Sequence, residues 1–168
     1  MKPGKIQFTF GLGQLRKYIF LRYCLFAMGA AAEMGDAERI KSTIDEIRGR
    51  ELKILIVDDD DRFRKSFCFK LKRIYKAQVD DVDRGRKGIE RIEAGYKYDL
   101  IFTDIMMPQM TGIETYYEIR KIDAQIPIVI MSAYSSSTEW QKALELKDVT
   151  LLHKPVPNDE LIEVLANA

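Results

Sequence analysis

The stretch Lys53-Ile-Leu-Ile-Val-Asp58-Asp59 decides the fold, because an unbroken apolar run ends directly in two acids. Near-continuous Ile, Leu and Val is typical of a strand that is buried on both faces of a parallel sheet. Three later apolar runs cover residues 98–103, 126–131 and 149–153, and they are followed by Asp104, Ser132 and Lys154. Functional groups of an open parallel sheet gather beyond the carboxyl ends of its strands, so the pattern predicts one shared site.

Helical patterns alternate with these apolar runs. After the first strand, residues at helical spacing form an apolar face with basic residues between them: Phe63, Phe67, Leu71 and Ile74. A short strand is predicted over 77–82, and further helices are predicted over 86–94, 113–122, 137–146 and from Asp159 onward. Strands that alternate with helices predict an α/β fold, with a five-stranded parallel sheet and helices on both of its faces.

The length of 168 residues and the apolar content of 46% are enough for one well-packed domain. The chain has 27 basic and 26 acidic residues. Residues 1–35 contain five of the basic residues and one of the acidic residues, so the rest of the chain has 22 basic and 25 acidic residues. A body with this balance lacks the basic surface that nucleic-acid binding requires, so no nucleic-acid partner is expected. Cys24 and Cys68 lie far apart and at no metal-binding spacing, which predicts a reduced protein in the cytoplasm.

Residues 1–35 are predicted to be a leader or a poorly ordered N-terminal extension ahead of the domain. Three interpretations stay open for them: an upstream leader without a structural role, a surface helix, or a targeting segment. The apolar stretch over 18–32 is interrupted by Arg22 and is too short to span a membrane, so no membrane association is expected.

Residues 36–50 are predicted to form an amphipathic N-terminal helix. Ile40, Ile44 and Ile47 recur at helical spacing, and Gly49 is placed to end the helix. The apolar stripe is thin and short. We expect it either to lie on the domain or to pair with a second copy of itself, which leaves a homodimer open.

Three carboxylates at one edge of the sheet pose an electrostatic problem. Close together, Asp58, Asp59 and Asp104 would raise one another's pKa and oppose folding. A hard divalent cation resolves this problem, and Mg²⁺ prefers oxygen ligands in a shell that keeps several waters. A carboxylate can also attack phosphorus to form an aspartyl phosphate, provided that cations neutralise the phosphoryl oxygens. Lys154 supplies such a cation, and Ser132 supplies a hydroxyl group.

Four segments, in this order and at fitting spacing, resemble the bacterial response-regulator receiver domain, and in particular a chemotaxis-type single-domain response regulator. They are Ile54-Leu-Ile-Val-Asp58-Asp59-Asp60, Tyr98-Asp-Leu-Ile-Phe-Thr-Asp104-Ile-Met-Met-Pro108-Gln-Met-Thr-Gly112, Ile128-Val-Ile-Met-Ser132-Ala133 and His153-Lys154-Pro155. The resemblance covers residues 52–166, which would form the receiver domain. It implies a flavodoxin-like, doubly wound sheet with the strand order 2-1-3-4-5.

The resemblance also implies a magnesium site that includes the phosphoacceptor. Asp104 would accept the phosphoryl group and ligate the metal. Asp59 would ligate Mg²⁺ directly, whereas Asp58 would hold it chiefly through water. The backbone carbonyl of Met106 would be a further ligand, so that its side chain matters little for the metal.

The implied phosphate-binding and switch residues lie at the ends of the fourth and fifth strands. Lys154 would pair with the phosphoryl group and be positioned by a cis peptide bond to Pro155. Ser132, which is followed by Ala133, would hydrogen-bond the phosphate and carry the signal outward. Receivers usually have an aromatic residue three places before the lysine, where this chain has Leu151, so the usual coupling of the two switch residues stays open.

Two bulky residues flank the expected phosphate: Met106, two places beyond Asp104, and Tyr134, two places beyond Ser132. Hydrolysis needs a water in line with the phosphorus, so we expect these side chains to hinder it and to tune the lifetime of the phosphorylated form. Thr111 replaces an acid that is common at its place in the family, and no consequence for the site is expected.

The predicted function is two-component phosphorelay signalling by a stand-alone receiver. A sensor histidine kinase or a phosphotransfer protein would phosphorylate Asp104 in a Mg²⁺-dependent reaction. The surface of the helix over 137–146, the strand over 149–153 and the last helix would then change its affinity for a downstream protein. The chain ends at Ala168, so no output domain is expected. Such a phosphoprotein can dephosphorylate itself, but it is no multi-turnover enzyme on an external substrate.

Two other functions remain open. Three acids after an apolar strand also fit the start of haloacid-dehalogenase-like phosphatases, in which Asp58 would be the nucleophile and Asp104 would have no role. The other alternative is a receiver-like adaptor that is never phosphorylated, an interpretation favoured by Leu151 in place of an aromatic residue.

Overall fold

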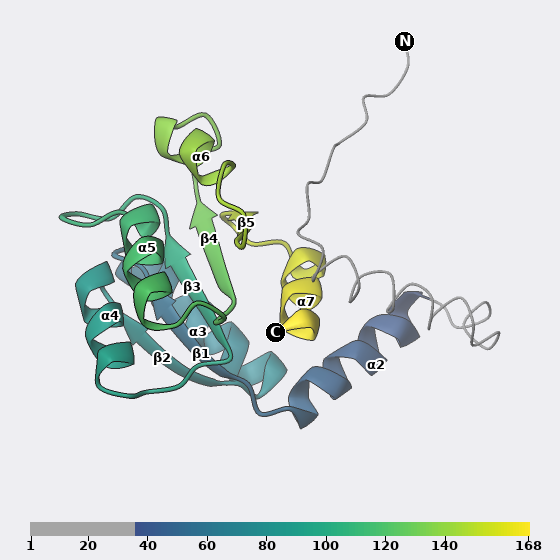
Figure 1. Ribbon diagram of the computed structural model, residues 1–168. Helices are drawn as coiled ribbons and strands as arrows, with labels where there is room; N and C mark the ends of the chain where they lie inside the picture. Colours follow the sequence, from purple (N-terminus) through teal and green to yellow (C-terminus); the bar gives the residue numbers. More distant parts are fainter. Residues whose placement is uncertain (1–35) are drawn as a thin grey trace, which may run out of the picture. The chain divides into compact units, whose positions relative to one another are not determined.

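The computed structural model describes residues 36–168, and the extension predicted over residues 1–35 lies outside them. Helices and strands alternate along the described chain (Figure 1). Their bounds are α2 (Asp36–Gly49), β1 (Lys53–Val57), α3 (Asp61–Tyr75), β2 (Gln78–Val82), α4 (Gly85–Glu93), β3 (Leu100–Asp104), α5 (Gly112–Ile122), β4 (Ile128–Ser132), α6 (Thr138–Ala143), β5 (Thr150–His153) and α7 (Asn158–Asn167).

The strands form one five-stranded sheet in which every neighbouring pair is parallel. The order is β2-β1-β3-β4-β5, which confirms the predicted flavodoxin-like order. After β2 the chain crosses over β1 to place β3 on the other side of it. Ligands of such sheets bind at this reversal, beyond the carboxyl ends of β1 and β3.

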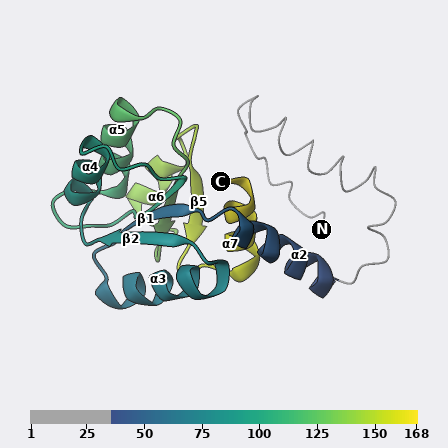
Figure 2. The same ribbon diagram turned by 90° about the horizontal axis from the view of Figure 1, so that it is seen from below.

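Alternate side chains of each strand contribute to two cores, one on each face of the sheet. In β1, Ile54 and Ile56 pack with α3 and α7, whereas Leu55 and Val57 pack with α4 and α5. Figure 2 shows these helix pairs on opposite sides of the strands. All residues of β3 and β4 are buried. This two-sided burial explains why the strands are nearly continuous apolar runs in the sequence.

The register of the strands brings the polar strand ends to one edge of the sheet. Val57 pairs with Thr103, so the residues that follow them, Asp58 and Asp104, lie at the ends of neighbouring strands. In the same way Ser132 pairs with His153, the residue before Lys154. The Lys154 amide donates to the Ser132 carbonyl at 2.8 Å, which continues the pairing by one residue.

Side-chain caps begin α3 and α5, two of the helices that start at this edge. Asp60 caps α3, because its carboxylate accepts the amides of Arg62 and Phe63 at 2.9 and 3.1 Å. Thr111 caps α5 and forms a reciprocal capping box with Glu114. Such a cap stabilises a helix by about 1 kcal/mol. Thr111 therefore has a structural role at the start of α5.

The helix predicted over 137–146 is shorter in the structure, where α6 has six residues. Ser137 caps its start by accepting the Trp140 amide at 3.1 Å. Near its end, Glu145 donates to the Lys142 carbonyl, only three residues back. The prediction was wrong at this end, because apolar spacing does not distinguish an α-helix from the tighter turns that follow it.

The N-terminal helix α2 contributes one side chain to the core. Ile47 is 1% exposed and packs in the cluster that includes α3 and α7, whereas Ile40 on the same helix is 49% exposed. Arg48 donates to the Ile74 carbonyl of α3 at 2.7 Å, and Arg50 donates to a carbonyl of α7 at 2.9 Å. Cations at helix C-termini are favourable. The end of α2 is therefore joined to two helices of the domain.

We expect Ile47→Val to lower the free energy of unfolding by about 1 kcal/mol, because it removes one buried methyl group. Ile40→Val should change it by less than about 0.5 kcal/mol, because that side chain is half exposed. Urea unfolding of the two variants measures both values. Equal effects would contradict the packing of α2 through Ile47.

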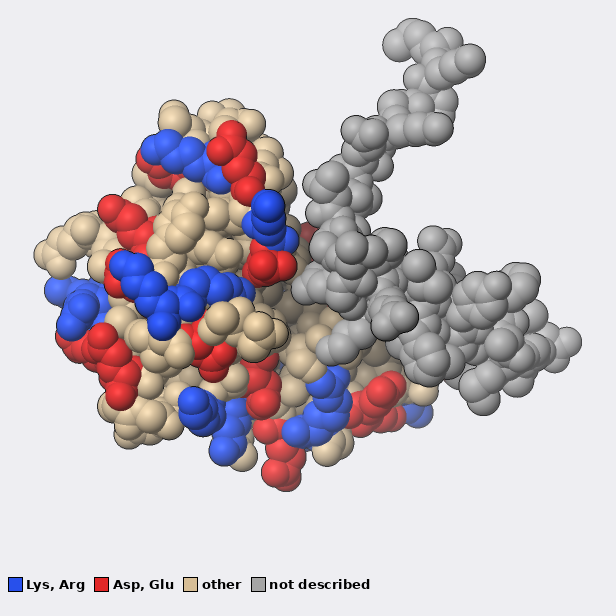
Figure 3. Space-filling view, viewed as in Figure 1, with Lys and Arg blue, Asp and Glu red and all other residues tan. Residues whose placement is uncertain are grey.

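Among residues 36–168, no helix has the length and the apolar character that crossing a membrane requires. Basic and acidic side chains are interspersed over the face shown in Figure 3. Many are neighbours on one helix, such as Lys65 with Asp61 and Lys121 with Glu118. Exposed pairs of this kind contribute about 0–1 kcal/mol each. The two apolar cores, and not the surface charges, therefore supply most of the stability.

Candidate functional site

Asp58 is the first residue beyond β1, and its side chain is fully buried. Its Oδ1 accepts the Asp60 amide at 3.0 Å, and its Oδ2 accepts from Lys154 Nζ at 2.6 Å. The Asp58 amide donates to the Val82 carbonyl at the end of β2, at 3.1 Å. Asp58 is therefore held by its own turn, by the end of β2 and by Lys154 beyond β5.

Lys154 joins Asp58 to Asp104, the last residue of β3. Its ammonium contacts one carboxylate oxygen of each acid, and its side chain is only 11% exposed. The ammonium also lies 4.4 Å from the centroid of the Phe63 ring on α3, at a distance where a cation is attracted to an aromatic face. Asp104 Oδ2 accepts the Met106 amide at 3.0 Å. The structure thus brings together two predicted acids and the predicted lysine.

Burial raises the pKa of both Asp58 and Asp104 above the ordinary value of aspartate. The Lys154 ammonium opposes this rise at both carboxyls. The charge of Asp104 adds to the rise in the pKa of Asp58, and the charge of Asp59 adds to the rise in the pKa of Asp104. The site therefore favours a further cation.

Ser132 ends β4 and is fully buried. Its hydroxyl donates to the Tyr134 carbonyl at 3.1 Å and accepts the Tyr134 amide at 3.0 Å. Ala133 and Tyr134 are exposed beyond it. Ser132 thus lies at the same edge of the sheet as Lys154, but its hydroxyl is engaged with its own loop.

The fifth strand contacts α6 beside the lysine. The peptide bond between Lys154 and Pro155 is cis, as the resemblance implied. Leu151 is half-buried and packs against the core on the α4 and α5 face. The His153 ring stacks on Trp140 of α6, with centroids 4.3 Å apart and an interplanar angle of 29°. Trp140, which is 8% exposed, is therefore a packed residue.

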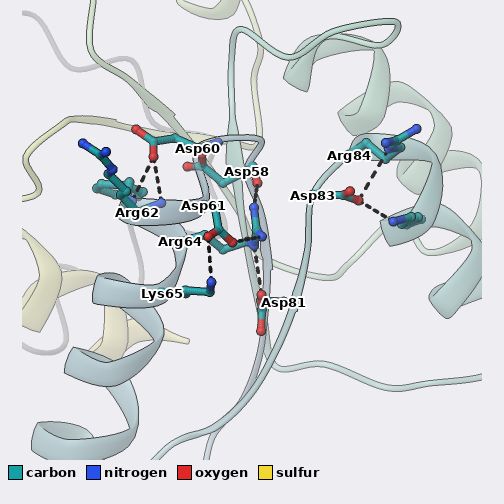
Figure 4. Close-up of polar contacts among 11 residues, drawn as sticks. Asp58, Asp60, Asp61, Arg62, Arg64, Lys65, Asp81, Asp83 and Arg84 are labelled. Atoms are coloured by element: carbon teal, nitrogen blue, oxygen red, sulfur yellow. Dashed lines mark hydrogen bonds and ion pairs between the residues drawn. The ribbon is translucent and has the colours of Figure 1, made fainter.

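The acids that follow Asp58 have separate surroundings. Asp59 is exposed. Asp60 caps α3, and the hydrogen bonds from the capped amides lower its pKa. Asp61 accepts from Arg64 at 2.8 Å (Figure 4). The acidic run therefore divides into one buried carboxylate, one free to face solvent, one helix cap and one ion-pair partner.

The donor set of this site suits a hard divalent cation. Asp58, Asp59 and Asp104 carry three negative charges near the single positive charge of Lys154. No three His, Cys, Asp or Glu side chains in residues 36–168 form a complete metal cage. Mg²⁺ does not need one, because it usually binds through one or two carboxylates and keeps several waters. The buried carboxylates and the excess negative charge therefore fit Mg²⁺.

Two residues that shape the site were not recognised as such in the sequence. Arg64 donates from Nη1 to the Asp58 carbonyl at 2.6 Å. Gly112 lies so close to the Asp104 backbone that a Cβ atom would not fit there. Gly112 stands in a segment that carries the family resemblance, which is a usable signal. In contrast, Arg64 is one of several basic residues between the apolar positions of α3, and nothing local distinguishes it.

Comparison with known proteins places this geometry in a family. The chain matches the family model of the response regulator receiver domain over residues 54–166. It is 34% identical over 122 residues to the transcriptional regulatory protein ZraR of Klebsiella oxytoca. That match covers 71% of this chain and 27% of ZraR, so the chain spans about a quarter of the relative's length.

Solved structures share the fold. The response regulator 1452 receiver domain of Francisella has a TM-score of 0.59 and 27% identity, and the match covers 69% of this chain and 97% of that chain. A response regulator receiver protein of Sinorhizobium medicae WSM419 has a TM-score of 0.60 and 29% identity, with 70% and 95% of the two chains covered. The chain therefore belongs to the response-regulator receiver family, the signalling domains of two-component systems.

Proposed function

We propose that Asp104 accepts a phosphoryl group from a sensor histidine kinase or a phosphotransfer protein in a Mg²⁺-dependent reaction. The observation that carries the proposal is the Lys154 ammonium in contact with both buried carboxylates, Asp58 and Asp104. Asp104 keeps 7% of its surface exposed, whereas Asp58 keeps none. Asp104 is therefore the more accessible of the two acids to a phosphodonor. Membership of the receiver family supports the same assignment.

In the transfer, a carboxylate oxygen of Asp104 attacks the phosphorus of a phosphohistidine. The new P–O bond forms as the P–N bond breaks, and the imidazole nitrogen of the donor takes up a proton. Lys154 already contacts Asp104, so its charge would offset that of a phosphoryl oxygen. Asp58, Asp59, Asp104 and the Met106 carbonyl would hold Mg²⁺, which supplies the remaining charge neutralisation.

Ser132 is the residue that we propose to carry the change outward. Its hydroxyl now bonds to the Tyr134 backbone, and binding a phosphoryl oxygen would require it to give up these bonds. The Tyr134 carbonyl also accepts the Ser137 hydroxyl at 3.1 Å, and Ser137 caps α6. Movement of Ser132 would therefore disturb the start of α6, and the half-buried Leu151 would adjust its rotamer to that movement.

The surface proposed for the downstream protein is formed by α6, β5 and α7. The stacked rings of Trp140 and His153 join α6 to β5, so a displacement of α6 changes both elements at once. We also propose a cytoplasmic location, which the free, buried Cys68 thiol supports. The proposed role is that of a switch, without turnover of an external substrate.

The test is to incubate the purified chain with acetyl phosphate and Mg²⁺ and to locate the modified residue by mass spectrometry. We expect modification at Asp104 that EDTA prevents. Absence of any modification would favour the adaptor that is never phosphorylated. Modification at Asp58 would favour the phosphatase, an alternative that is already weakened because Asp58 is fully buried.

We expect the double variant Met106→Asn, Tyr134→Glu to shorten the lifetime of phosphorylated Asp104 by about tenfold. Met106 is 49% exposed and Tyr134 is 69% exposed, so both bulky side chains stand on the solvent side. Polar replacements would admit a water and orient it for attack. Decay of the phosphorylated form after removal of the donor measures the lifetime. Leu144→Glu, at an exposed position at the end of α6, is the control, and equal decay in all three proteins would reject the idea.

A further inference from the structure

Arg64 lies on α3, one turn after the helix cap, and only 9% of its surface is exposed. All three of its guanidinium nitrogens donate to acceptors, which lie on three different segments (Figure 4). Nε donates to Asp81 Oδ2 of β2 at 2.9 Å, and Nη2 donates to Asp61 Oδ1 at 2.8 Å. Nη1 donates to the Asp58 carbonyl at 2.6 Å. This network joins β2 and α3 to the end of β1.

The bond to the Asp58 carbonyl reaches the proposed metal site through the backbone. That carbonyl belongs to the planar peptide group that links Asp58 to Asp59. Fixing the direction of the carbonyl fixes the plane, and with it the point from which the Asp59 side chain departs. The Asp58 amide is held separately by the Val82 carbonyl of β2. Arg64 therefore orients the peptide on the side that leads to Asp59.

We infer that Arg64 is a positioning residue, which holds the Asp58–Asp59 peptide so that both carboxylates are presented to Mg²⁺. The inference rests on the proposed function, because it concerns the same metal site. Asp61 and Asp81 hold the guanidinium in turn and balance its charge. An arginine suits this task because its rigid planar group directs several donors at fixed angles, whereas lysine carries a flexible point charge.

Three possible roles of Arg64 predict different changes in Mg²⁺ affinity when the residue is replaced. A positive charge near a cation site repels the cation, so a purely electrostatic role predicts tighter Mg²⁺ binding when Arg64 is neutralised. A role in stability alone predicts easier unfolding but unchanged Mg²⁺ affinity of the folded protein. Positioning predicts weaker Mg²⁺ binding, even when the charge is kept.

The experiment is calorimetric titration of the metal-free chain with Mg²⁺, for the wild type, Arg64→Gln and Arg64→Lys. We expect the Kd for Mg²⁺ to rise by about tenfold in Arg64→Gln, as is usual when a residue that orients a metal ligand is removed. Arg64→Lys should also raise the Kd, because it keeps the charge and loses the planar group. The control is Lys65→Gln, which removes the same charge from the next residue and from the same partner, Asp61, at a side chain that is 74% exposed.

An unchanged or lower Kd in folded Arg64→Lys overturns the inference and leaves the proposed function intact. If Arg64→Gln does not fold, the Kd of Arg64→Lys is compared with that of the wild type on its own. If the wild-type chain binds no Mg²⁺, the Mg²⁺ dependence in the proposed function is wrong, and the inference about Arg64 is wrong as well.

A second measurement needs no metal. The Asp60 amide donates to Asp58 Oδ1 at 3.0 Å, so its hydrogen exchange reports on the order of this turn. We expect faster exchange of that amide in metal-free Arg64→Lys and no change in Lys65→Gln. Equal protection of the Asp60 amide from exchange in both variants would contradict the proposal that Arg64 orders this turn.

Discussion

Asp104→Asn should reduce phosphorylation by acetyl phosphate to background. An amide in place of the carboxylate provides no anionic oxygen to attack phosphorus, so no acyl phosphate can form. The variant should still fold, because the amide has nearly the same shape and Lys154 keeps its contact with Asp58 at 2.6 Å. Incorporation of labelled phosphate, followed by mass spectrometry of the digested protein, measures the loss.

Asp148→Asn is the matched control for Asp104→Asn, because Asp148 is an exposed acid in the loop before β5. It should take up phosphate at the rate of the wild type. Two results together would contradict the assignment of the phosphoacceptor: full incorporation in Asp104→Asn, and loss of incorporation in Asp58→Asn. That pair of results would instead favour a phosphatase with Asp58 as its nucleophile.

Gly112→Ala should damage both the fold and the site. A Cβ atom at this position would lie inside the contact distance of the Asp104 carbonyl oxygen and 3.0 Å from Ile105 Cα. These are backbone atoms at the end of β3 and just beyond it, so the start of α5 would have to move away from them. We expect the free energy of unfolding to fall by about 3 kcal/mol. Displacement of Asp104 should also slow its phosphorylation, by up to about a hundredfold.

Gly49→Ala provides the comparison for Gly112→Ala, because no atom lies within 4 Å of a Cβ built at Gly49. In this position alanine should leave the stability unchanged or raise it by up to about 1 kcal/mol, through lower entropy of the unfolded chain. Urea unfolding and a time course of phosphorylation on both variants separate the two cases. A stable, fully active Gly112→Ala protein would show that the loop and α5 are not in tight contact.

The sheet was predictable from the sequence for a physical reason. Strands that are covered by helices on both sides are apolar at nearly every position, as β3 and β4 are up to the polar residues near their ends, so each strand is a long apolar run in the sequence. In a parallel sheet the ends of such runs meet at one edge, which explains why Asp58, Asp104 and Lys154 were grouped before any contact was known. Their chemical roles remain predictions that the experiments above address.

Features that depend on contacts between distant segments were not predictable. Arg64 has the spacing of a solvent-facing helix residue, and only its bond to Asp81, 17 residues away, reveals its place. The Ser132 hydroxyl was expected near phosphate, and in the structure it forms a local turn with Tyr134. The capping box of Thr111 and Glu114 follows a known local pattern, so that signal was available in the sequence.

The ring pair that joins α6 to β5 gives this protein a built-in optical probe. Trp140 is the sole tryptophan in the chain, so all indole emission originates at the contact with His153. A change in that contact alters the environment of the one indole ring. Unlabelled protein in a stopped-flow cuvette can therefore report how fast this face rearranges when a phosphodonor is mixed in.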